Sequence, residues 1–356
     1  MSTPIFSIIC AIHNSESTLL RMLNSILDED LDFEWYEIIA VDDCSTDSSN
    51  NILHQFRENH PEVHMSILKT PYGTIHCPSN TRQYGLFHAC GRWIRFIDGD
   101  DIFVNHGCKK FLEYVNHLSV EPAMVKSEIL RSSSDSSQIE PYPTNVTLLH
   151  GNFYNRAFLV NHDILFYPNM KLFEDMYFNS CCFSNVFYFE NPNTSLGYMS
   201  DVTYQWVEDS NSLSNEIMAE SKGHVELYQI DDWIKSSFDP FEKYLHIWPV
   251  PNQELFKNRI CQICFGLYYY YENALYRKEL DDIDTDIIIH SKESIVSCLS
   301  SINKICTDAF RVDMNKLMND HSDIFCEQYF LVTDTNNYFV PIHSYDEFIK
   351  SICESL

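Results

Sequence analysis

Short apolar runs alternate with helix-like stretches through the first hundred residues of the chain. The first run, Ile5–Ile12, is apolar almost throughout, which is typical of a parallel strand covered on both faces. Leucines then recur at helical spacing over residues 19–27. Such alternation predicts parallel strands joined by helical crossovers, with a crevice at the carboxyl ends of the strands. The expected strands are Ile5–Ile12, Tyr36–Val41, His64–Leu68 and Trp93–Ile97, and the helix before the last of them is Ser79–Ala89.

The fourth strand ends in the acidic turn Asp98-Gly99-Asp100-Asp101. In an extended segment Asp98 and Asp100 point the same way, so their carboxylates can share a hard cation, and Mn²⁺ or Mg²⁺ suits oxygen ligands best. Gly99 allows a sharp turn and a close approach to a ligand. A cation held there would favour a second anionic ligand, a diphosphate above all. The alternative is a solvated acidic turn, because Asp-Gly is a common turn pair.

Charge and length limit the classes of function. The formal net charge of −27 argues against non-specific binding of DNA or RNA phosphates and against docking on an anionic membrane. A nucleotide ligand would therefore need local help from a metal or an arginine. At 356 residues the chain is longer than a single hydrophobic core usually grows, which favours two domains.

The cysteines and apolar runs bear on the cellular compartment. Thirteen cysteines, scattered without a disulfide framework, are typical of a reducing cytoplasm. The N-terminus lacks the charged region and apolar segment of a secretion signal. The longest apolar run, Ile260–Tyr271, falls short of the ~20 residues that span a bilayer. We therefore expect a cytoplasmic protein without a transmembrane segment.

Four blocks of sequence follow one another in a specific order over roughly residues 4–215. They are 7–14 (SIICAIHN), 41–47 (VDDCSTD), 80–101 (from NTR to the acidic turn) and 173–178 (FEDMYF). In order and spacing they resemble the family 2 glycosyltransferases. The resemblance implies a GT-A fold, an α/β nucleotide-binding Rossmann-like sandwich, over residues 1–215. It also identifies Asp98 and Asp100 with the DxD metal motif of that fold.

The chemistry of these residues and the resemblance together predict a site for a nucleotide-sugar donor. Asp42 and Asp43 end a strand beside the crevice, where a carboxylate can accept hydrogen bonds from the base or ribose. Capping of the next helix is the alternative for both. Arg82, just before the fourth strand, is the natural second cation for a phosphate or a sugar hydroxyl. The whole expected donor site is Ala11, His13, Asn14, Asp42, Asp43, Arg82, Asp98 and Gly99.

Asp175 is the expected general base. Aromatic residues flank it at positions 173, 177 and 178, and an apolar setting raises the pKa of a carboxylate towards the useful range. The resemblance gives the same role to this aspartate in inverting members of the family, with Glu174 as a helper or cap. Both carboxylates could also simply begin a helix, which is compatible with catalysis. The resemblance places the segment that contains His150 near the acceptor.

The chain departs from the family pattern in two places. Ala11 and His13 stand where the family usually has proline and tyrosine, so the wall against the nucleobase differs. After the Glu-Asp block many relatives carry a histidine that is a candidate extra metal ligand, and this chain has none there. Asp209 or Asn211 could replace it as a metal ligand, or the ligand is missing.

From residue 216 onward the strand alternation is lost. Helical spacing marks Val225–Phe238, Gln253–Leu280, Ser291–Phe310 and Tyr345–Ser355, which predicts a mainly helical C-terminal domain over 216–356. Its apolar stripes suggest a role in assembly, as a homo-oligomer, or in presenting the acceptor.

The leading hypothesis is an inverting, metal-dependent glycosyltransferase that uses a UDP-sugar and a hydroxyl acceptor on a glycan or polyol. Within that class the blocks are most similar to bacterial enzymes that decorate envelope polymers. A nucleotidyltransferase is one alternative, but it would carry a basic, glycine-rich loop after the first strand, which residues 13–17 do not provide. A non-catalytic binding module is another, but it would be expected to lose the acidic motifs, whereas Asp98, Asp100 and Asp175 are all present.

Overall fold

The computed structural model describes residues 3–71, 73–133, 138–142, 148–208, 217, 228–245, 259–260, 263–264, 266–267 and 285–305. The chain divides into two compact units, Met1–Glu216 and Ile217–Leu356.

The first unit is built on a nine-stranded sheet with the order β3-β2-β1-β4-β8-β6-β9-β5, and β7 pairs with β6. Strands β1 to β4 are parallel, as the alternation of apolar runs predicts. Beyond β4 the pairs are antiparallel except for β6 with β9, which makes the sheet mixed. The strands are β1 Phe6–Ile12, β2 Tyr36–Asp42, β3 His64–Lys69, β4 Trp93–Asp98, β5 Ile102–Phe103, β6 Met124–Ser132, β7 Ile139–Tyr142, β8 Asn152–Asn155 and β9 Leu196–Val207.

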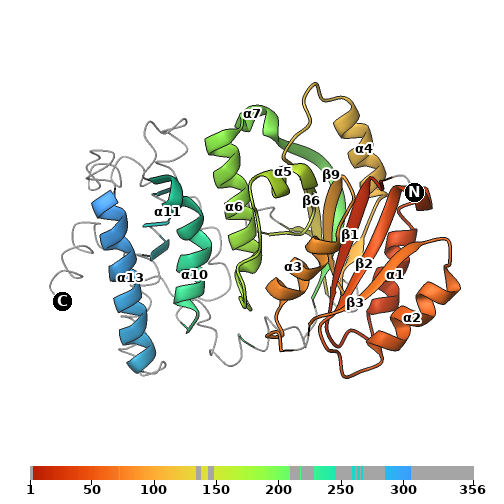
Figure 1. The fold of residues 1–356 in the computed structure, drawn as a ribbon, viewed down its shortest axis with the longest axis horizontal. Helices are drawn as coiled ribbons and strands as arrows, with labels where there is room; N and C mark the ends of the chain where they lie inside the picture. The colour runs from red at the N-terminus through yellow and green to blue at the C-terminus, as the bar shows by residue number, and fades with distance from the viewer. Residues whose placement is uncertain are drawn as a thin grey trace. The chain divides into compact units, whose positions relative to one another are not determined.

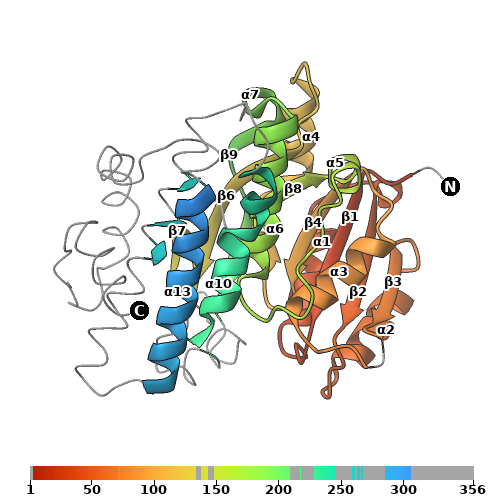
Figure 2. The same ribbon diagram turned by 60° about the vertical axis from the view of Figure 1, so that its left-hand side comes forward.

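Helices cover both faces of the parallel strands (Figures 1 and 2), and β1, β2 and β4 are almost fully buried, whereas the edge strand β3 is partly exposed. On one face α1, α2 and α4 pack against side chains of β1 such as Ile8 and Cys10. On the other face α3, α5 and α6 pack against Ile9 and its neighbours. This explains why β1 has no polar alternation. The helices of this unit are α1 Leu19–Leu27, α2 Ser49–Asn59, α3 Pro78–His88, α4 Gly107–Asn116, α5 Arg156–Asn161, α6 Glu174–Phe189 and α7 Pro192–Ser195, with a 3₁₀ turn at Phe33–Trp35.

The described part of the second unit is helical. It contains α10 (Ile230–Ser237), α11 (Asp239–Leu245) and α13 (Thr285–Ile305). Asp231 joins α10 to α13. The Asp231 carboxylate accepts hydrogen bonds from His290 at 2.9 Å and from Ser294 at 2.8 Å, and both of these residues lie on α13. The helix expected over Tyr345–Ser355 lies outside the described residues, as does most of the one expected over Gln253–Leu280. Among the residues that the structure describes, no helix is long and apolar enough to cross a membrane.

Candidate active site

The parallel order of the sheet brings the predicted donor residues to one edge. β1 lies between β2 and β4, with Ile12 opposite Asp42 and Ala11 opposite Asp98. The segments that follow β1 and β2 therefore lie beside the acidic turn that follows β4. This edge is where ligands bind in open α/β sheets.

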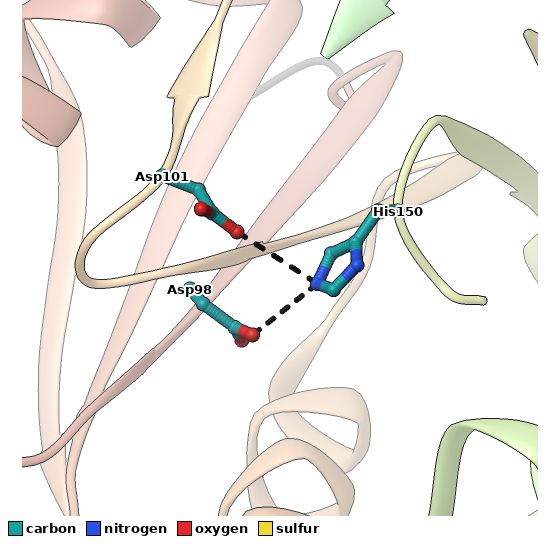
Figure 3. A group of neighbouring side chains, drawn as sticks. All are labelled: Asp98, Asp101 and His150. Atoms are coloured by element: carbon teal, nitrogen blue, oxygen red, sulfur yellow. Dashed lines mark hydrogen bonds and ion pairs between the residues drawn. The ribbon is translucent and has the colours of Figure 1, made fainter. Parts of the chain in front are cut away.

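Asp98 and Asp101 from the acidic turn meet His150, which precedes β8 (Figure 3). His150 Nε2 lies 3.3 Å from Asp98 Oδ2 and 3.8 Å from Asp101 Oδ2. The ring of His150 also packs on Tyr204 of β9, with 4.9 Å between the ring centroids. One residue from outside the acidic turn thus completes a cluster of two carboxylates and an imidazole.

Asp101 is fixed by the end of β9. Tyr204 donates its hydroxyl to Asp101 Oδ2 at 2.6 Å, and the backbone N–H of Val207 donates to Oδ1 at 2.8 Å. The Asp101 side chain is only 1% exposed. Burial, together with the charges of Asp100 and Asp98, raises the pKa of Asp101.

Arg82 on α3 is a buried bridge between two acidic residues. Its Nη2 donates to both oxygens of Asp98, at 2.7 and 2.9 Å, and its Nη1 donates to Glu174 Oε1 at 2.5 Å. Burial alone would favour neutral Asp98, but the charges of Arg82 and His150 outweigh it and hold the pKa of Asp98 well below its usual range. Burial likewise disfavours the imidazolium of His150, yet its contact with Asp98 raises its pKa to about 9. The positive charges of Arg82 and His150 therefore stabilise the ionised carboxylate of Asp98 at the end of β4.

Asp175 follows Glu174 in the first turn of α6, where the helix dipole favours carboxylates. Its Oδ1 accepts the backbone N–H of Met176 at 2.7 Å. Phe173 enters the helix with a φ of 64°, a strained conformation for a residue with a Cβ, so the chain turns abruptly into these carboxylates. Burial raises the pKa of Asp175, although the charges of His150 and Arg82 lower it. A carboxylate with a raised pKa suits a general base.

Two of the predicted donor residues tie β1 to the loop after β2. His13 Nδ1 donates to the carbonyl oxygen of Asp43 at 2.8 Å. Asn14 Oδ1 accepts the backbone N–H of Thr46 at 2.8 Å, and the Asn14 N–H donates to Ser45 Oγ at 3.0 Å. Both residues are exposed at this edge of the sheet. In the described contacts, His13 and Asn14 therefore order the loop.

The remaining predicted residues have the following positions. A Cβ on Gly99 would lie 2.5 Å from Ser15 Oγ, so the close approach that requires glycine is made by the loop after β1. Asp100 lies in the acidic turn, and its carbonyl oxygen accepts a hydrogen bond from Arg21 Nη2 at 2.6 Å. Its carboxylate does not belong to the Asp98, Asp101 and His150 cluster of the described residues. Asp209 and Asn211 lie outside the residues described.

The side chains at the end of β4 fit a divalent cation. The ligand atoms of Asp98, Asp101 and His150 all lie within 4.8 Å of one another. Carboxylate oxygens and imidazole nitrogens are both ligands for divalent metal ions in proteins. The hydrogen bonds from Tyr204 and Val207 orient the Asp101 carboxylate, as outer partners do for metal ligands.

Comparison with known proteins bears directly on this site. A model of the glycosyl transferase family 2 matches residues 7–179, a range that contains every block named above. An uncharacterized glycosyltransferase of Haemophilus influenzae is 30% identical over 192 residues, which are 51% of this chain and 73% of that protein. This chain belongs to glycosyl transferase family 2.

A longer relative also matches about half of this chain. The poly(ribitol-phosphate) beta-N-acetylglucosaminyltransferase TarS of Staphylococcus aureus is 27% identical over 191 residues, 51% of this chain but 33% of TarS. This family member thus spans about a third of the length of TarS. The crystal structure of S. aureus TarS 1–349 with UDP-GlcNAc matches 91% of this chain and 89% of that chain, with a TM-score of 0.58 at 17% identity. The match shows a shared fold, which confirms the predicted GT-A class.

Sequence reasoning missed two contributors to the site. The sequence pattern places His150 near the acceptor. Only the pairing of β8 with β4 and β6 places the loop before β8, which contains His150, at the acidic turn. Tyr204 had no assigned role, although it contacts both Asp101 and His150. An isolated histidine and an isolated tyrosine carry no spacing signal, so no pattern in the sequence identifies them.

Proposed function

We propose that this family 2 member transfers a sugar from a UDP-sugar to a hydroxyl group of a glycan or polyol, with inversion at the anomeric carbon. The observation that carries the proposal is the Arg82 bridge between Asp98 and Glu174. The bridge places the acidic turn at the end of the parallel sheet beside the carboxylates that begin α6. Diphosphate chemistry and proton abstraction can thus occur in one crevice.

The proposed donor lies along the carboxyl ends of β2, β1 and β4. Its nucleoside is held near Asp42 and Asp43, and its diphosphate lies near Asp98 and Asp100. When bound on Asp98 and Asp100, Mn²⁺ or Mg²⁺ would act as a Lewis acid that neutralises the charge of the leaving diphosphate. Arg82 contributes by fixing the orientation of Asp98, because its guanidinium nitrogens are directed at Asp98 and Glu174.

Asp175 is the proposed base. Its carboxylate takes the proton of the acceptor hydroxyl as the hydroxyl oxygen forms a bond to the anomeric carbon. The bond between that carbon and the phosphate oxygen breaks, and its electron pair leaves with UDP. A single base of this kind yields the inverted sugar directly, since attack occurs on the face opposite the leaving group. Placing the base within the first turn of a helix keeps it fixed relative to Arg82 and Asp98.

The names of relatives support the substrate class. TarS is named for poly(ribitol-phosphate) and for N-acetylglucosamine, and its matched structure contains UDP-GlcNAc. UDP-GlcNAc is therefore the first donor to test, and a polyol phosphate polymer is the first acceptor. The formal net charge of −27 disfavours a polyanionic acceptor, so glycans and free polyols belong in the same panel.

The test is a panel of nucleotide sugars with Mn²⁺, scored by acceptor-dependent release of nucleoside diphosphate and by mass of the glycosylated acceptor. We expect turnover with a UDP-sugar and loss of that turnover on chelation of the metal. Nucleotide-sugar binding without any product across the panel would support a binding module instead. Release of sugar 1-phosphate, with the nucleoside monophosphate attached to the acceptor, would indicate a nucleotidyltransferase.

A further inference from the structure

The nucleoside end of the crevice contains two consecutive carboxylates with different hydrogen-bond partners. Asp42 is turned into its own loop, where Oδ1 accepts the N–H of Ser45 at 2.9 Å and Oδ2 faces Asn50 Nδ2 at 3.5 Å. Asp42 is only 1% exposed, so it has little surface for a ligand. Its role is to order the turn after β2. Asp43 is left as the carboxylate that can meet a nucleobase.

Asp43 Oδ1 accepts two hydrogen bonds, and Oδ2 accepts none from the described residues. Thr70, just after β3, donates its hydroxyl to Oδ1 at 2.9 Å, and His76 Nδ1 donates to the same atom at 3.0 Å. The Asp43 side chain is 7% exposed, and Oδ2 is not among the buried atoms that lack a partner in the described residues, so this oxygen reaches solvent. A ligand N–H can therefore approach Oδ2. Asp43 therefore presents one acceptor atom at the edge of the sheet where the donor is expected.

We infer that His76 is a positioning residue that makes Asp43 selective for uracil. By holding Oδ1 together with Thr70, His76 fixes the rotamer of the carboxylate and leaves a single acceptor, Oδ2, for the base. His76 is supplied by the loop between β3 and α3, and its side chain is 53% exposed, so it can be replaced without opening the core. The inference rests on the proposed function, because it assumes that the donor nucleoside lies beside Asp43.

The hydrogen-bonding edges of the bases explain the selectivity. Uracil offers one imide N–H between two carbonyl groups, which matches one free carboxylate oxygen. Cytosine has a bare ring nitrogen at the same position, so two acceptors would face each other. Guanine offers two adjacent N–H donors, which pair best with a carboxylate whose two oxygens are both free. Occupation of Oδ1 by Thr70 and His76 therefore disfavours guanine.

The test measures the binding of UDP, CDP and GDP to the full chain by calorimetry in the presence of Mn²⁺. We compare wild type with His76→Ala, and with His76→Asn, whose amide nitrogen lies close to the position of Nδ1. His88→Ala is the matched control, because His88 is an exposed histidine on α3 whose Nδ1 contacts the carbonyl oxygen of Tyr84. Circular dichroism checks that each variant is folded.

We expect wild type to prefer UDP, and His76→Ala to raise the Kd for UDP about tenfold, as for a lost hydrogen bond to a charged group. The Kd values for CDP and GDP should change by less than about threefold. His76→Asn should restore the preference, and His88→Ala should leave it intact. With saturating donor, kcat of His76→Ala should stay near the wild-type value, because Asp43 acts only in binding.

Several results would overturn the inference. They are a wild-type preference for GDP or CDP, an unchanged ratio of UDP to GDP affinity in His76→Ala, and equal weakening of all three nucleotides. The last result would indicate a purely structural role for His76. Failure of the proposed function is separate: selective binding of UDP that depends on His76, without sugar transfer to any acceptor, would leave the inference intact and refute the transferase.

Discussion

Arg82 and Glu174 form a buried ion pair between residues 92 positions apart in the sequence, with 2.5 Å between Nη1 and Oε1. The other terminal nitrogen of Arg82 contacts both carboxylate oxygens of Asp98. A planar guanidinium can serve two carboxylates in this way, whereas the ammonium of a lysine cannot present two fixed pairs of donors. This one side chain therefore joins the end of β4 to the start of α6, and with it the proposed metal ligand to the proposed base.

Removing Arg82 should destabilise the protein strongly. The Arg82 side chain is 7% exposed, so Arg82→Ala leaves the nearly buried Glu174 without its counter-charge and removes one of the two cationic partners of the partly buried Asp98, at a cost of about 3–5 kcal/mol. Arg92→Ala is the control, since Arg92 pairs with Glu121 but is 62% exposed, and such surface pairs contribute at most ~1 kcal/mol. Urea unfolding measures both free energies. Similar small losses in the two variants would show that the bridge does not hold the site together.

Activity should fall on the acid side of the pH profile. Burial raises the pKa of Asp175, so its carboxylate is protonated at a higher pH than an ordinary carboxyl group of about 4. A protonated carboxylate cannot accept the acceptor's proton, so kcat decreases as pH falls through that raised pKa. The profile of kcat between pH 4 and 9 measures this limb. An acid limb that is retained unchanged in Asp175→Asn would assign it to another group.

Chelation of divalent metal should abolish transfer, and Mn²⁺ or Mg²⁺ should restore it. Asp100→Ala should then abolish the metal-dependent turnover while the fold stays intact, because Asp100 is a proposed ligand at a half-buried position of the acidic turn. Asp30→Ala is the control, since Asp30 is an exposed acid paired with Lys109. Undiminished, metal-dependent turnover in Asp100→Ala would contradict this ligand set. It would favour Asp98, Asp101 and His150, which the structure groups together.

The parallel half of the fold could be predicted closely from sequence. The runs 5–12, 36–41, 64–68 and 93–97 became β1 to β4, and the nearly continuous apolar run of β1 reflects its burial on both faces. The strand ends were marked by polar residues such as Asp42 and Asp98. Local chemistry determines both features, so local patterns reveal them.

Contacts that depend on the mixed half of the sheet could not be predicted in this way. His150 reaches Asp98 only because β8 pairs antiparallel with β4, and Tyr204 reaches Asp101 only because β9 lies beside β5. Strand pairing between distant segments leaves no periodic mark in either one. Arg82 was expected to contact the donor phosphate, and the contacts described here are with Asp98 and Glu174. Assembly through residues 216–356 and a metal ligand at Asp209 stay predictions.

The most direct test of the account is the single-turnover rate of sugar transfer by Asp175→Asn, measured with calorimetric titration of the same UDP-sugar. A general base acts in the transition state, so we predict a rate lower by roughly 10²–10⁴-fold with donor affinity nearly unchanged. The amide is close in size to the carboxylate, which keeps the start of α6 packed. A transfer rate equal to that of wild type would contradict the proposed base, and a parallel loss of rate and donor affinity would place Asp175 in donor binding instead.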